Sequence, residues 1–318
     1  MTVRRTLPLS GTSKDWNDFL MSTPADRPAR LSVGVISAGR VGAVLGAALS
    51  RAGHRVVSVA AVSDPSRKRA AELLPGADVR PPDEVAADVD LLLLAVPDDA
   101  LGALAAGLAV AGTLRRGTMV AHTSGAHGVG VLAPLVEAGA LPLALHPVMT
   151  FTGTDVDLQR LDGAAWGVTS DEVLRPVAET LVIEMGGEPS FVAEELRPLY
   201  HAGLAFAANH LVTLVTQADD LLQASGVEQP QRMLGPLLGA ALDNALRNGD
   251  RALTGPVARG DAGTVAKHLQ TLAEHAPESL DAYIAMGRLT AARALASGTL
   301  DVDQAAALLD VLATRPHP

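Results

Sequence analysis

The sequence has no cysteine among its 318 residues. Disulfides, thiolate nucleophiles, iron–sulfur clusters and cysteine zinc sites are therefore excluded, and a cytoplasmic location fits this composition best. We predict no metal site. Aromatic residues are also scarce, at 3% of the chain, so the core has to be built from Ala, Val and Leu.

The chain also has few positive charges: it contains 25 Lys and Arg residues against 35 Asp and Glu residues, which gives a formal net charge of -10. Such an excess repels polyanions, so we predict no nucleic-acid partner. The uncharged stretch 199–218 has about the length of a membrane span, but it contains polar residues such as His201, Asn209 and Gln217 that are costly in lipid. We expect a buried helix there and no membrane partner. The polar residues after Arg5 do not resemble a secretory signal.

The order of apolar and polar segments predicts two domains. From Leu31 onward, short apolar runs alternate with amphipathic stretches of helix length, which is the pattern of βαβ units. The nearly unbroken apolar run over 90–97 is typical of a central parallel strand that is covered on both faces. The predicted fold class is α/β, with a doubly wound parallel Rossmann sheet followed by an all-α domain. The predicted parts are a mobile N-terminal extension (1–30), a dinucleotide-binding domain (31–192) and a helical substrate and dimerisation domain (193–318).

The first apolar run ends in a glycine-containing turn that opens an Ala-rich helix. The dinucleotide fingerprint needs one small residue for a tight turn, one for approach to the pyrophosphate and one for helix–strand packing. These positions hold Ser37, Gly39 and Gly42, so serine replaces the first glycine. A turn that only packs is the alternative, but free amides at a helix start favour an anion. We predict that the cofactor contacts Ser37, Ala38, Gly39, Arg40, Val41 and Gly42, with Val96 and Pro97 beside it.

The end of the second apolar run decides between the two nicotinamide cofactors. Asp64 can accept a hydrogen bond from the ribose 2′-OH, which favours NAD, or it can cap the next helix. Ser63 with Arg67 and Lys68 can instead hold a 2′-phosphate, which favours NADP. For Arg69, and for Lys68 by itself, we expect a solvated helix face. We favour NADP, and NAD stays open.

Six short motifs, taken together, give the chain a family resemblance. Over residues 31 to about 312 it resembles the Rossmann-like proteins with a DUF2520 C-terminal domain, which are relatives of pyrroline-5-carboxylate reductase, ketopantoate reductase and the 6-phosphogluconate dehydrogenase group. The resemblance implies a nicotinamide-dependent oxidoreductase. The motifs are VGVISAGRVG (33–42), LAVPD (94–98), HTSGA (122–126), LHPVMTF (145–151), Tyr200–His201 and Asn209–His210.

Two positions depart from the pattern of these relatives. Ser37 stands where the family usually has glycine. The β-hydroxyacid and ketopantoate reductases use a Lys and Asn pair near the start of the second domain. The only lysines here are Lys14, Lys68 and Lys267, so the corresponding helix supplies none.

The catalytic prediction starts from the rule that ligands of open α/β sheets bind beyond the carboxyl ends of the strands. Reduction by a nicotinamide also needs a proton or hydrogen bond at the heteroatom. Without cysteine or a suitable lysine, we predict His146 and His201 as proton donors, because a histidine pKa near neutrality suits proton transfer. The alternative for each is a hydrogen-bonded core histidine. Ser124 and Gly125 offer a hydroxyl and an approachable backbone to the substrate, although a simple turn would look the same.

The helical part supplies two further candidates. Asn209 lies eight residues after His201, on nearly the same helix face, so the two could line one wall. Tyr200 and His201 face different directions, so we expect at most one of them in the cleft. Arg259 could hold a substrate carboxylate, whereas Asp261 is expected to be a helix N-cap.

These residues predict an NAD(P)-dependent oxidoreductase. It would transfer a hydride to or from a small keto-acid or imine-type substrate bound between the domains. The alternative is a non-catalytic NADP-binding sensor or regulatory protein, which the missing lysine favours. A methyltransferase that uses S-adenosylmethionine fits less well, because the helical second half resembles reductases. The Ala/Leu-rich helical domain predicts a homodimer.

Overall fold

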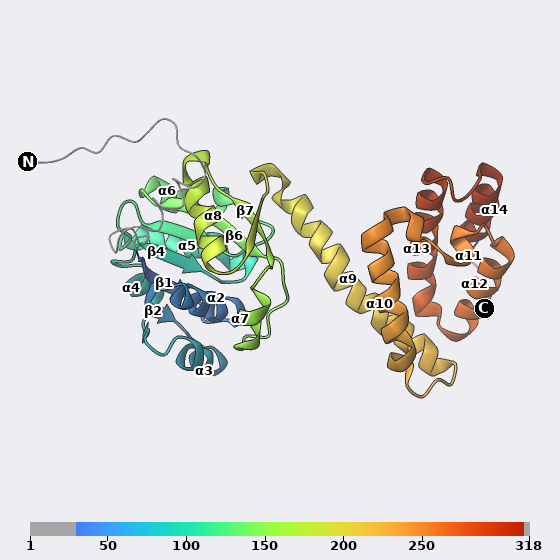
Figure 1. Ribbon diagram of the computed structural model, residues 1–318, viewed down its shortest axis with the longest axis horizontal. Helices are drawn as coiled ribbons and strands as arrows, with labels where there is room; N and C mark the ends of the chain where they lie inside the picture. Colours follow the sequence, from blue (N-terminus) through green and yellow to red (C-terminus); the bar gives the residue numbers. More distant parts are fainter. Residues whose placement is uncertain (1–29, 315–318) are drawn as a thin grey trace, which may run out of the picture. The chain divides into compact units, whose positions relative to one another are not determined.

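The computed structural model describes residues 30–314, so the predicted N-terminal extension lies outside the described residues except for Arg30. The chain divides into two compact units, Met1–Leu204 and Ala205–Pro318, each with a hydrophobic core of its own. The boundary falls inside one long helix, α9 (Arg197–Ala224). Figure 1 shows both units and labels most of their helices and strands.

The first unit contains an eight-stranded sheet in the order β3-β2-β1-β4-β5-β6-β7-β8. Strands β1 to β6 run parallel, β7 is antiparallel to β6, and β8 is parallel to β7. The first six strands have the order of the Rossmann fold, with the switch point between β1 and β4, which confirms the predicted fold class. The strands are β1 (Ser32–Ile36), β2 (Arg55–Ala60), β3 (Asp78–Val79), β4 (Leu91–Leu94), β5 (Met119–His122), β6 (Leu141–Pro147), β7 (Ala165–Thr169) and β8 (Glu188–Phe191).

Helices cover both faces of this sheet, and two hydrophobic clusters fill the layers between. Strand β4 is buried at every position: Leu91 and Leu93 pack in one cluster, and Leu92 and Leu94 in the other. This double covering explains its unbroken apolar sequence. One layer contains α2 (Arg40–Arg51), α3 (Asp64–Leu73), α7 (Val156–Arg160) and α8 (Arg175–Glu184); the other contains α4 (Pro82–Val85), α5 (Asp98–Ala111) and α6 (Ala133–Glu137).

The start of α3 differs from the capping role considered for Asp64, and α5 begins without a side-chain cap. Ser63, not Asp64, caps α3, because the Ser63 Oγ accepts a hydrogen bond from the Ser66 amide at 3.3 Å. Asp98 is the first residue of α5, and Pro97 precedes it without a side-chain cap. Both carboxylates therefore lie in a first helical turn, where the helix dipole favours negative charge.

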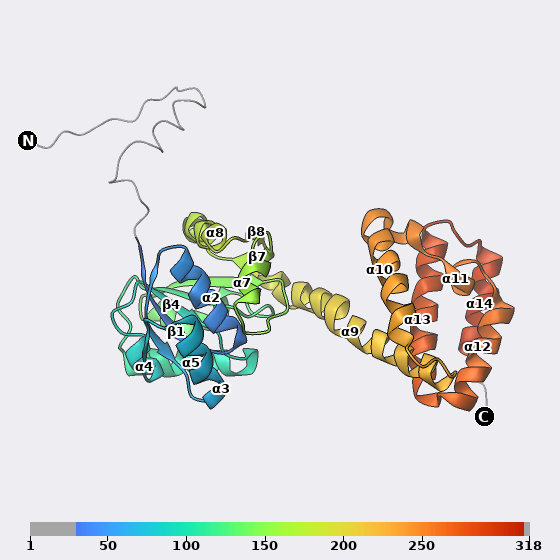
Figure 2. The same ribbon diagram turned by 60° about the horizontal axis from the view of Figure 1, so that its bottom comes forward.

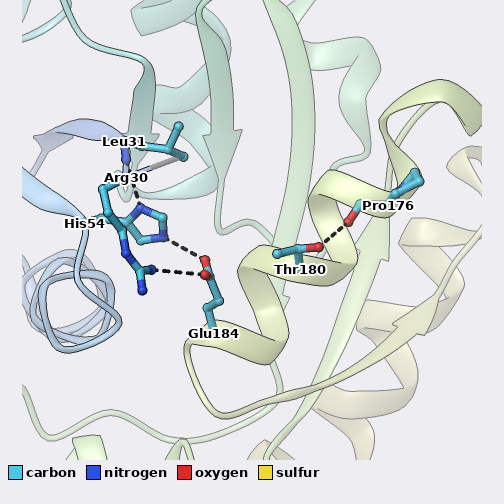
Figure 3. A network of polar contacts seen from close by, with 6 residues as sticks. All are labelled: Arg30, Leu31, His54, Pro176, Thr180 and Glu184. Carbon is cyan, nitrogen blue, oxygen red and sulfur yellow. Dashed lines mark hydrogen bonds and ion pairs between the residues drawn. The ribbon is translucent and has the colours of Figure 1, made fainter. Parts of the chain in front are cut away.

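A polar network ties the end of α8 to the amino end of β1 (Figure 3). The buried His54 Nδ1 accepts a hydrogen bond from the Leu31 amide at 3.2 Å, so its Nε2 carries the proton and donates to Glu184 Oε2 at 2.8 Å. Arg30 pairs with the other oxygen of Glu184 at 3.2 Å. The network fixes the end of the sheet opposite the loops that follow the strands.

The second unit is helical in its described residues. Its core lies among four helices, of which α12, α13 and α14 lie side by side (Figure 2). Asp261 caps α12 through the Thr264 amide at 3.0 Å, as predicted. No helix within residues 30–314 is both long and apolar enough to cross a membrane. Besides the rest of α9, the helices are α10 (Pro230–Asn248), α11 (Gly255–Ala258), α12 (Ala262–His275), α13 (Pro277–Ala296) and α14 (Val302–Ala313).

Candidate functional site

Four loops meet at the carboxyl edge of the parallel strands, as the sequence predicts. They follow β1, β4, β5 and β6; the first contains Ser37 and the third Ser124, and His146 lies near the end of β6. Ser63, Asp64 and Arg67 instead follow β2. The loop after β1 lies at the switch point, where open α/β sheets bind their ligands.

The turn after β1 is strained at its serine. Ser37 has φ +80°, the left-handed region that favours glycine, which explains why glycine is expected there. Hydrogen bonds from the amides of Ser37 and Ala38 to the Ala60 carbonyl, at 3.1 and 3.0 Å, hold this conformation. A Cβ on Gly42 would collide with the Ser37 carbonyl oxygen and would lie 2.9 Å from the Ala95 Cβ. Only glycine therefore allows α2 to pack this closely on the sheet.

The start of α2 fits a diphosphate. Gly39 is the N-cap and no side chain caps the helix, so the first-turn amides are free for a ligand. The Ser37 Oγ lies 3.4 Å from the position of a Cβ on Gly39, and no residue in the described part of the chain hydrogen-bonds to it. Free amides, a hydroxyl and the positive helix end suit the pyrophosphate of a dinucleotide.

Two arginines border this turn, and one of them differs from the sequence-based expectation. Arg69 does not lie on a solvated helix face: its Nε donates to the Ala38 carbonyl at 3.2 Å. A Cβ on Gly153 would lie 2.8 Å from the Arg40 Cγ and 3.0 Å from the Arg69 Cδ, so both side chains pack on that glycine. Lys68 does lie in solvent, 76% exposed, beside Glu72.

The three residues expected to choose the cofactor lie together at the start of α3. Arg67 is 3.6 Å from Asp64, and both side chains are exposed, at 60% and 97%. The Ser63 hydroxyl oxygen already accepts the Ser66 amide. At the end of β4, Val96 is half-buried and Pro97 is exposed.

The predicted catalytic residues of the first unit converge on Gly125. A Cβ added there would lie 2.7 Å from the His201 Cδ2 and 3.0 Å from the His146 Nε2. The two imidazole rings are 6.0 Å apart, edge to face. Tyr200 lies on the other edge of the same ring, with its hydroxyl 2.8 Å from the His146 Nδ1. The expectation that Tyr200 and His201 face different directions does not hold, because both side chains contact His146.

His146 is neutral at neutral pH. Its pKa is lowered to about 4, first by burial and then by the charges of Arg197 and His201, while Asp98 opposes the shift. The expectation of a near-neutral pKa does not hold, because the ring lies against the sheet beside a cation. Burial also raises the pKa of Tyr200, so the phenol keeps its proton.

His122 is a buried residue that the sequence reasoning did not select. Its Nδ1 accepts the Ser124 amide at 3.2 Å, and its Nε2 donates to the Gly128 carbonyl at 2.9 Å. Burial lowers the pKa of His122 to about 4. The buried Ser124 hydroxyl accepts the His127 amide at 3.1 Å, so it also shapes the loop after β5.

Arg197, at the start of α9, is fully buried and was also missed. Its Nε donates to the Thr169 hydroxyl at 2.7 Å, and its terminal nitrogens donate to the carbonyls of Ala144, Gly167 and Ser124 at 2.9, 3.1 and 3.3 Å. All four acceptors are neutral. No carboxylate forms an ion pair with it in the described part of the chain. A lone arginine in a polar stretch gave no pattern that would have identified it.

Glu194 fastens the segment before α9 to the loop after β5. Its two carboxylate oxygens accept the amides of Val129 and Gly130 at 2.7 and 2.9 Å. A Cβ on Gly128 would displace this carboxylate, so glycine there permits the contact. Residues 194–201 are therefore anchored to the first unit at several points.

Two predicted site residues belong to the second unit. Asn209 and Arg259 are both exposed within it, and their roles stay predictions. Within residues 30–314, no group of three or more His, Asp or Glu side chains is arranged to hold a metal ion.

The topology of the sheet and the turn at its carboxyl edge define a Rossmann-type nucleotide-binding domain, which is followed by a helical domain. Two family models match: the Rossmann-like domain over residues 21–147 and the domain of unknown function DUF2520 over residues 164–290. The chain therefore contains both domains, which confirms the resemblance read from the motifs. No curated protein matches it in sequence.

Solved structures share the fold at low identity. A Bacteroides fragilis protein named as a candidate NADP oxidoreductase is 20% identical, with 82% of this chain and 98% of that chain covered and a TM-score of 0.67. The protein TM1727 from Thermotoga maritima is 18% identical, with 84% and 99% covered and a TM-score of 0.64. An imine reductase from Myxococcus stipitatus, in complex with NADP+, is 17% identical, with 89% and 100% covered and a TM-score of 0.61.

Proposed function

We propose that the protein is an NADP-dependent oxidoreductase that transfers a hydride to or from a small keto-acid or imine-type substrate. The observation that carries this proposal is the uncapped start of α2 against the strained Ser37 turn, where only Gly42 permits the close packing. Such a turn at a sheet switch point suits the pyrophosphate of a nicotinamide dinucleotide. The imine reductase of the same fold binds NADP+.

The bound cofactor would supply the hydride, and this chain's own residues would position and protonate the substrate. His146 and His201 flank Gly125 beside the Ser124 loop, so they can hydrogen-bond to a heteroatom placed there. A neutral imidazole can donate from one nitrogen while it accepts at the other. In this proposal Asn209 contributes an amide, and Arg259 binds a substrate carboxylate.

We propose that arginines near the Ser37 turn select NADP over NAD. Arg67 is exposed beside Ser63, and Arg69 keeps two guanidinium nitrogens free beside Ala38. In a chain with a net charge of -10, such a group of cations favours a phosphate.

Fluorescence-quench titration with NADPH and NADH tests the cofactor assignment. Wild type should bind NADPH more tightly, and Arg67→Ala should lower the NADPH-to-NADH affinity ratio about tenfold, the effect of one charge-assisted contact. Arg69→Ala shows which arginine contributes more, and Arg51→Ala, which removes an exposed arginine at the far end of α2, is the matched control. An unchanged ratio in Arg67→Ala would remove that residue from the assignment. Absence of binding to either nucleotide would refute the proposed function.

A non-catalytic NADP-binding sensor is the second candidate. Its support is the lack of any lysine between Lys68 and Lys267, so the start of α9 cannot supply one. A panel of 2-keto acids and cyclic imines, incubated with saturating NADPH, separates the two functions. The enzyme should oxidise NADPH with at least one of them, whereas the sensor should bind the nucleotide and oxidise it with none.

We further propose that the protein is a cytoplasmic homodimer. The second unit has an apolar hollow of about 460 Å³ lined by Phe206, Leu211, Leu214 and Met286, among others. Exposed apolar patches of this kind are typical of association surfaces. Sedimentation equilibrium tests the dimer, and a monomer at micromolar concentration would refute it.

A further inference from the structure

We propose that Tyr200 stores the proton of the reaction and delivers it through neutral His146 to a carbonyl oxygen, so that the substrates are ketones or keto acids and not cationic imines. This inference rests on the proposed function and narrows it. Here His146 is the catalytic residue, and Tyr200 and Arg197 act through it.

The geometry places a phenol, an imidazole and an unpaired ring nitrogen in series among the described residues. The Tyr200 hydroxyl lies 2.8 Å from the His146 Nδ1, and the two rings meet edge to face at 89°. A backbone hydrogen bond at Gly167 also acts on the phenol and lowers its pKa, which leaves the O–H free to donate to His146. The Nε2 of His146 has no partner in the described part of the chain and is not among the buried unsatisfied atoms there. It is therefore the atom that can reach a substrate.

The positive charge of Arg197 favours transfer of the proton from Tyr200 to His146. Its guanidinium carbon is 5.7 Å from the centre of the Tyr200 ring, and all four of its hydrogen-bond acceptors are neutral. Its positive charge is therefore only partly balanced, by the more distant Glu194. A buried cation stabilises a phenolate and disfavours an imidazolium nearby.

The proton transfer is balanced without any further group from the protein. As a hydride from the reduced nicotinamide reaches the carbonyl carbon, the C=O π electrons move to oxygen. The His146 Nε2–H proton goes to that oxygen, and the Tyr200 O–H proton goes to the His146 Nδ1. Tyr200 is left as a phenolate beside Arg197, and His146 is left with its proton on Nδ1. After the product leaves, a proton from solvent binds the His146 Nε2 and the Nδ1 proton returns to Tyr200, which restores the starting state. The products are an alcohol and the oxidised nicotinamide.

The same charges discriminate between substrate classes. An alkoxide is a much stronger base than a phenolate, so Tyr200 can protonate it even though burial raises the pKa of this phenol. Negative charge that develops on oxygen is also stabilised by Arg197. An iminium ion arrives positive and already protonated, so it needs no proton and is repelled by the same arginine. Carbonyl reduction is therefore favoured.

The ring nitrogens of His146 provide a test that needs no substrate. In 15N NMR of the full chain, with His146→Gln to assign the signals, wild type should show the proton on Nε2 and a hydrogen-bonded Nδ1. Tyr200→Phe should shift the Nδ1 signal and keep the fold. Tyr283→Phe is the matched control, because Tyr283 forms an equivalent bond to the His268 Nδ1, at 2.7 Å, within the second unit. A proton on the His146 Nδ1 would overturn the relay.

Kinetics on the NADPH-loaded protein test the substrate class. With the 2-keto acid that wild type reduces fastest, Tyr200→Phe should lower kcat about 100-fold or more and change KM little, whereas Tyr283→Phe should match wild type. Retained kcat in Tyr200→Phe overturns the relay, and reduction of cyclic imines alone overturns the substrate class. If NADPH is bound but nothing is reduced, the proposed function fails, and the NMR result still decides the relay.

The pH dependence of kcat distinguishes a Tyr200 phenol donor from a His146 imidazolium donor. The charged and titratable groups that act on His146 are Arg197, His201, Asp98 and Tyr200. With Tyr200 as the donor, kcat should stay level from pH 6 to 9 and fall only as the phenol ionises. A His146 imidazolium donor would instead lose activity about tenfold per pH unit above its pKa of about 4. Such an acid-limited profile would overturn the proposal.

Discussion

The clearest consequence of the site's electrostatics is that two buried histidines make the first unit sensitive to acid. His122 and His146 both have pKa values lowered from 6.5 to about 4. A shift of this size corresponds to about 3 kcal/mol for each ring. In the unfolded chain both rings titrate near the ordinary value. Below about pH 6.5 the unfolded state therefore binds more protons than the folded state.

The direction of the effect follows from that difference in bound protons. Above about pH 6.5 neither state protonates these rings, so they add no pH dependence. As the pH falls from about 6.5 to about 4, the free energy of unfolding should decrease by up to about 3 kcal/mol for each histidine. His146→Gln removes one of the two titrating groups. The variant should therefore lose about 3 kcal/mol less than wild type over this range, whatever its stability at pH 7.

Urea unfolding at pH 7, 5 and 4 measures this difference. Trp166 is fully buried in β7, and Trp16 is the only other tryptophan, so a Trp16→Phe background gives a fluorescence signal from the first unit. His268→Gln, in the second unit, is the control and should leave the pH dependence of the first unit unchanged. Equal pH dependence in wild type and His146→Gln would show that His146 titrates near its ordinary value. That result would also remove the argument for a neutral relay.

Two further predictions concern packing around the site and at the opposite end of the sheet. Gly125→Ala should lower the free energy of unfolding by about 1–3 kcal/mol and displace the ring of His201 or His146, because the new Cβ would lie 2.7 Å from the His201 Cδ2 and 3.0 Å from the His146 Nε2. Urea unfolding measures the loss of stability, and the NMR signals of the histidine rings measure the displacement. Unchanged ring signals would contradict the geometry. Glu184→Ala should lower the free energy of unfolding by about 2 kcal/mol, because it leaves the buried Nε2–H of His54 unpaired; Glu184→Gln, which keeps an acceptor, should recover part of the loss.

The parts of the fold that follow from local pattern could be predicted. The sequence of β4 is apolar at every position because both faces are buried, and the loops at the ends of the parallel strands meet because parallel strands share an edge. The position of Ser37 was expected to suit glycine, and its φ of +80° gives the reason. Each of these features depends on a few neighbouring residues.

The parts of the site that depend on long side chains could not be predicted. Arg69 reaches back 31 positions in the sequence to the Ala38 carbonyl, and Arg197 reaches Ser124 across 73. Neither contact leaves a periodic signal, because the acceptors are backbone carbonyls that any residue provides. The pairing of Tyr200 with His146 was missed for a related reason. Helical periodicity gives the direction of a side chain at its Cβ, not at the end of a phenol ring.

The arginines near the carboxyl edge of the sheet differ in solvent exposure, and this difference suits them to different roles. Arg67, at the start of α3, is 60% exposed and lies 3.6 Å from the exposed Asp64, so solvent screens this ion pair and an incoming phosphate can compete for the guanidinium. Arg197 is fully buried, and four of its five N–H groups already donate to neutral oxygens, so it presents no solvent-exposed donor to a ligand. It acts only through its field, which is weakly screened at that depth. Solvated cations therefore suit binding of a phosphate, whereas the buried cation lowers the pKa values of His146 and Tyr200, in addition to the larger effect of burial on each.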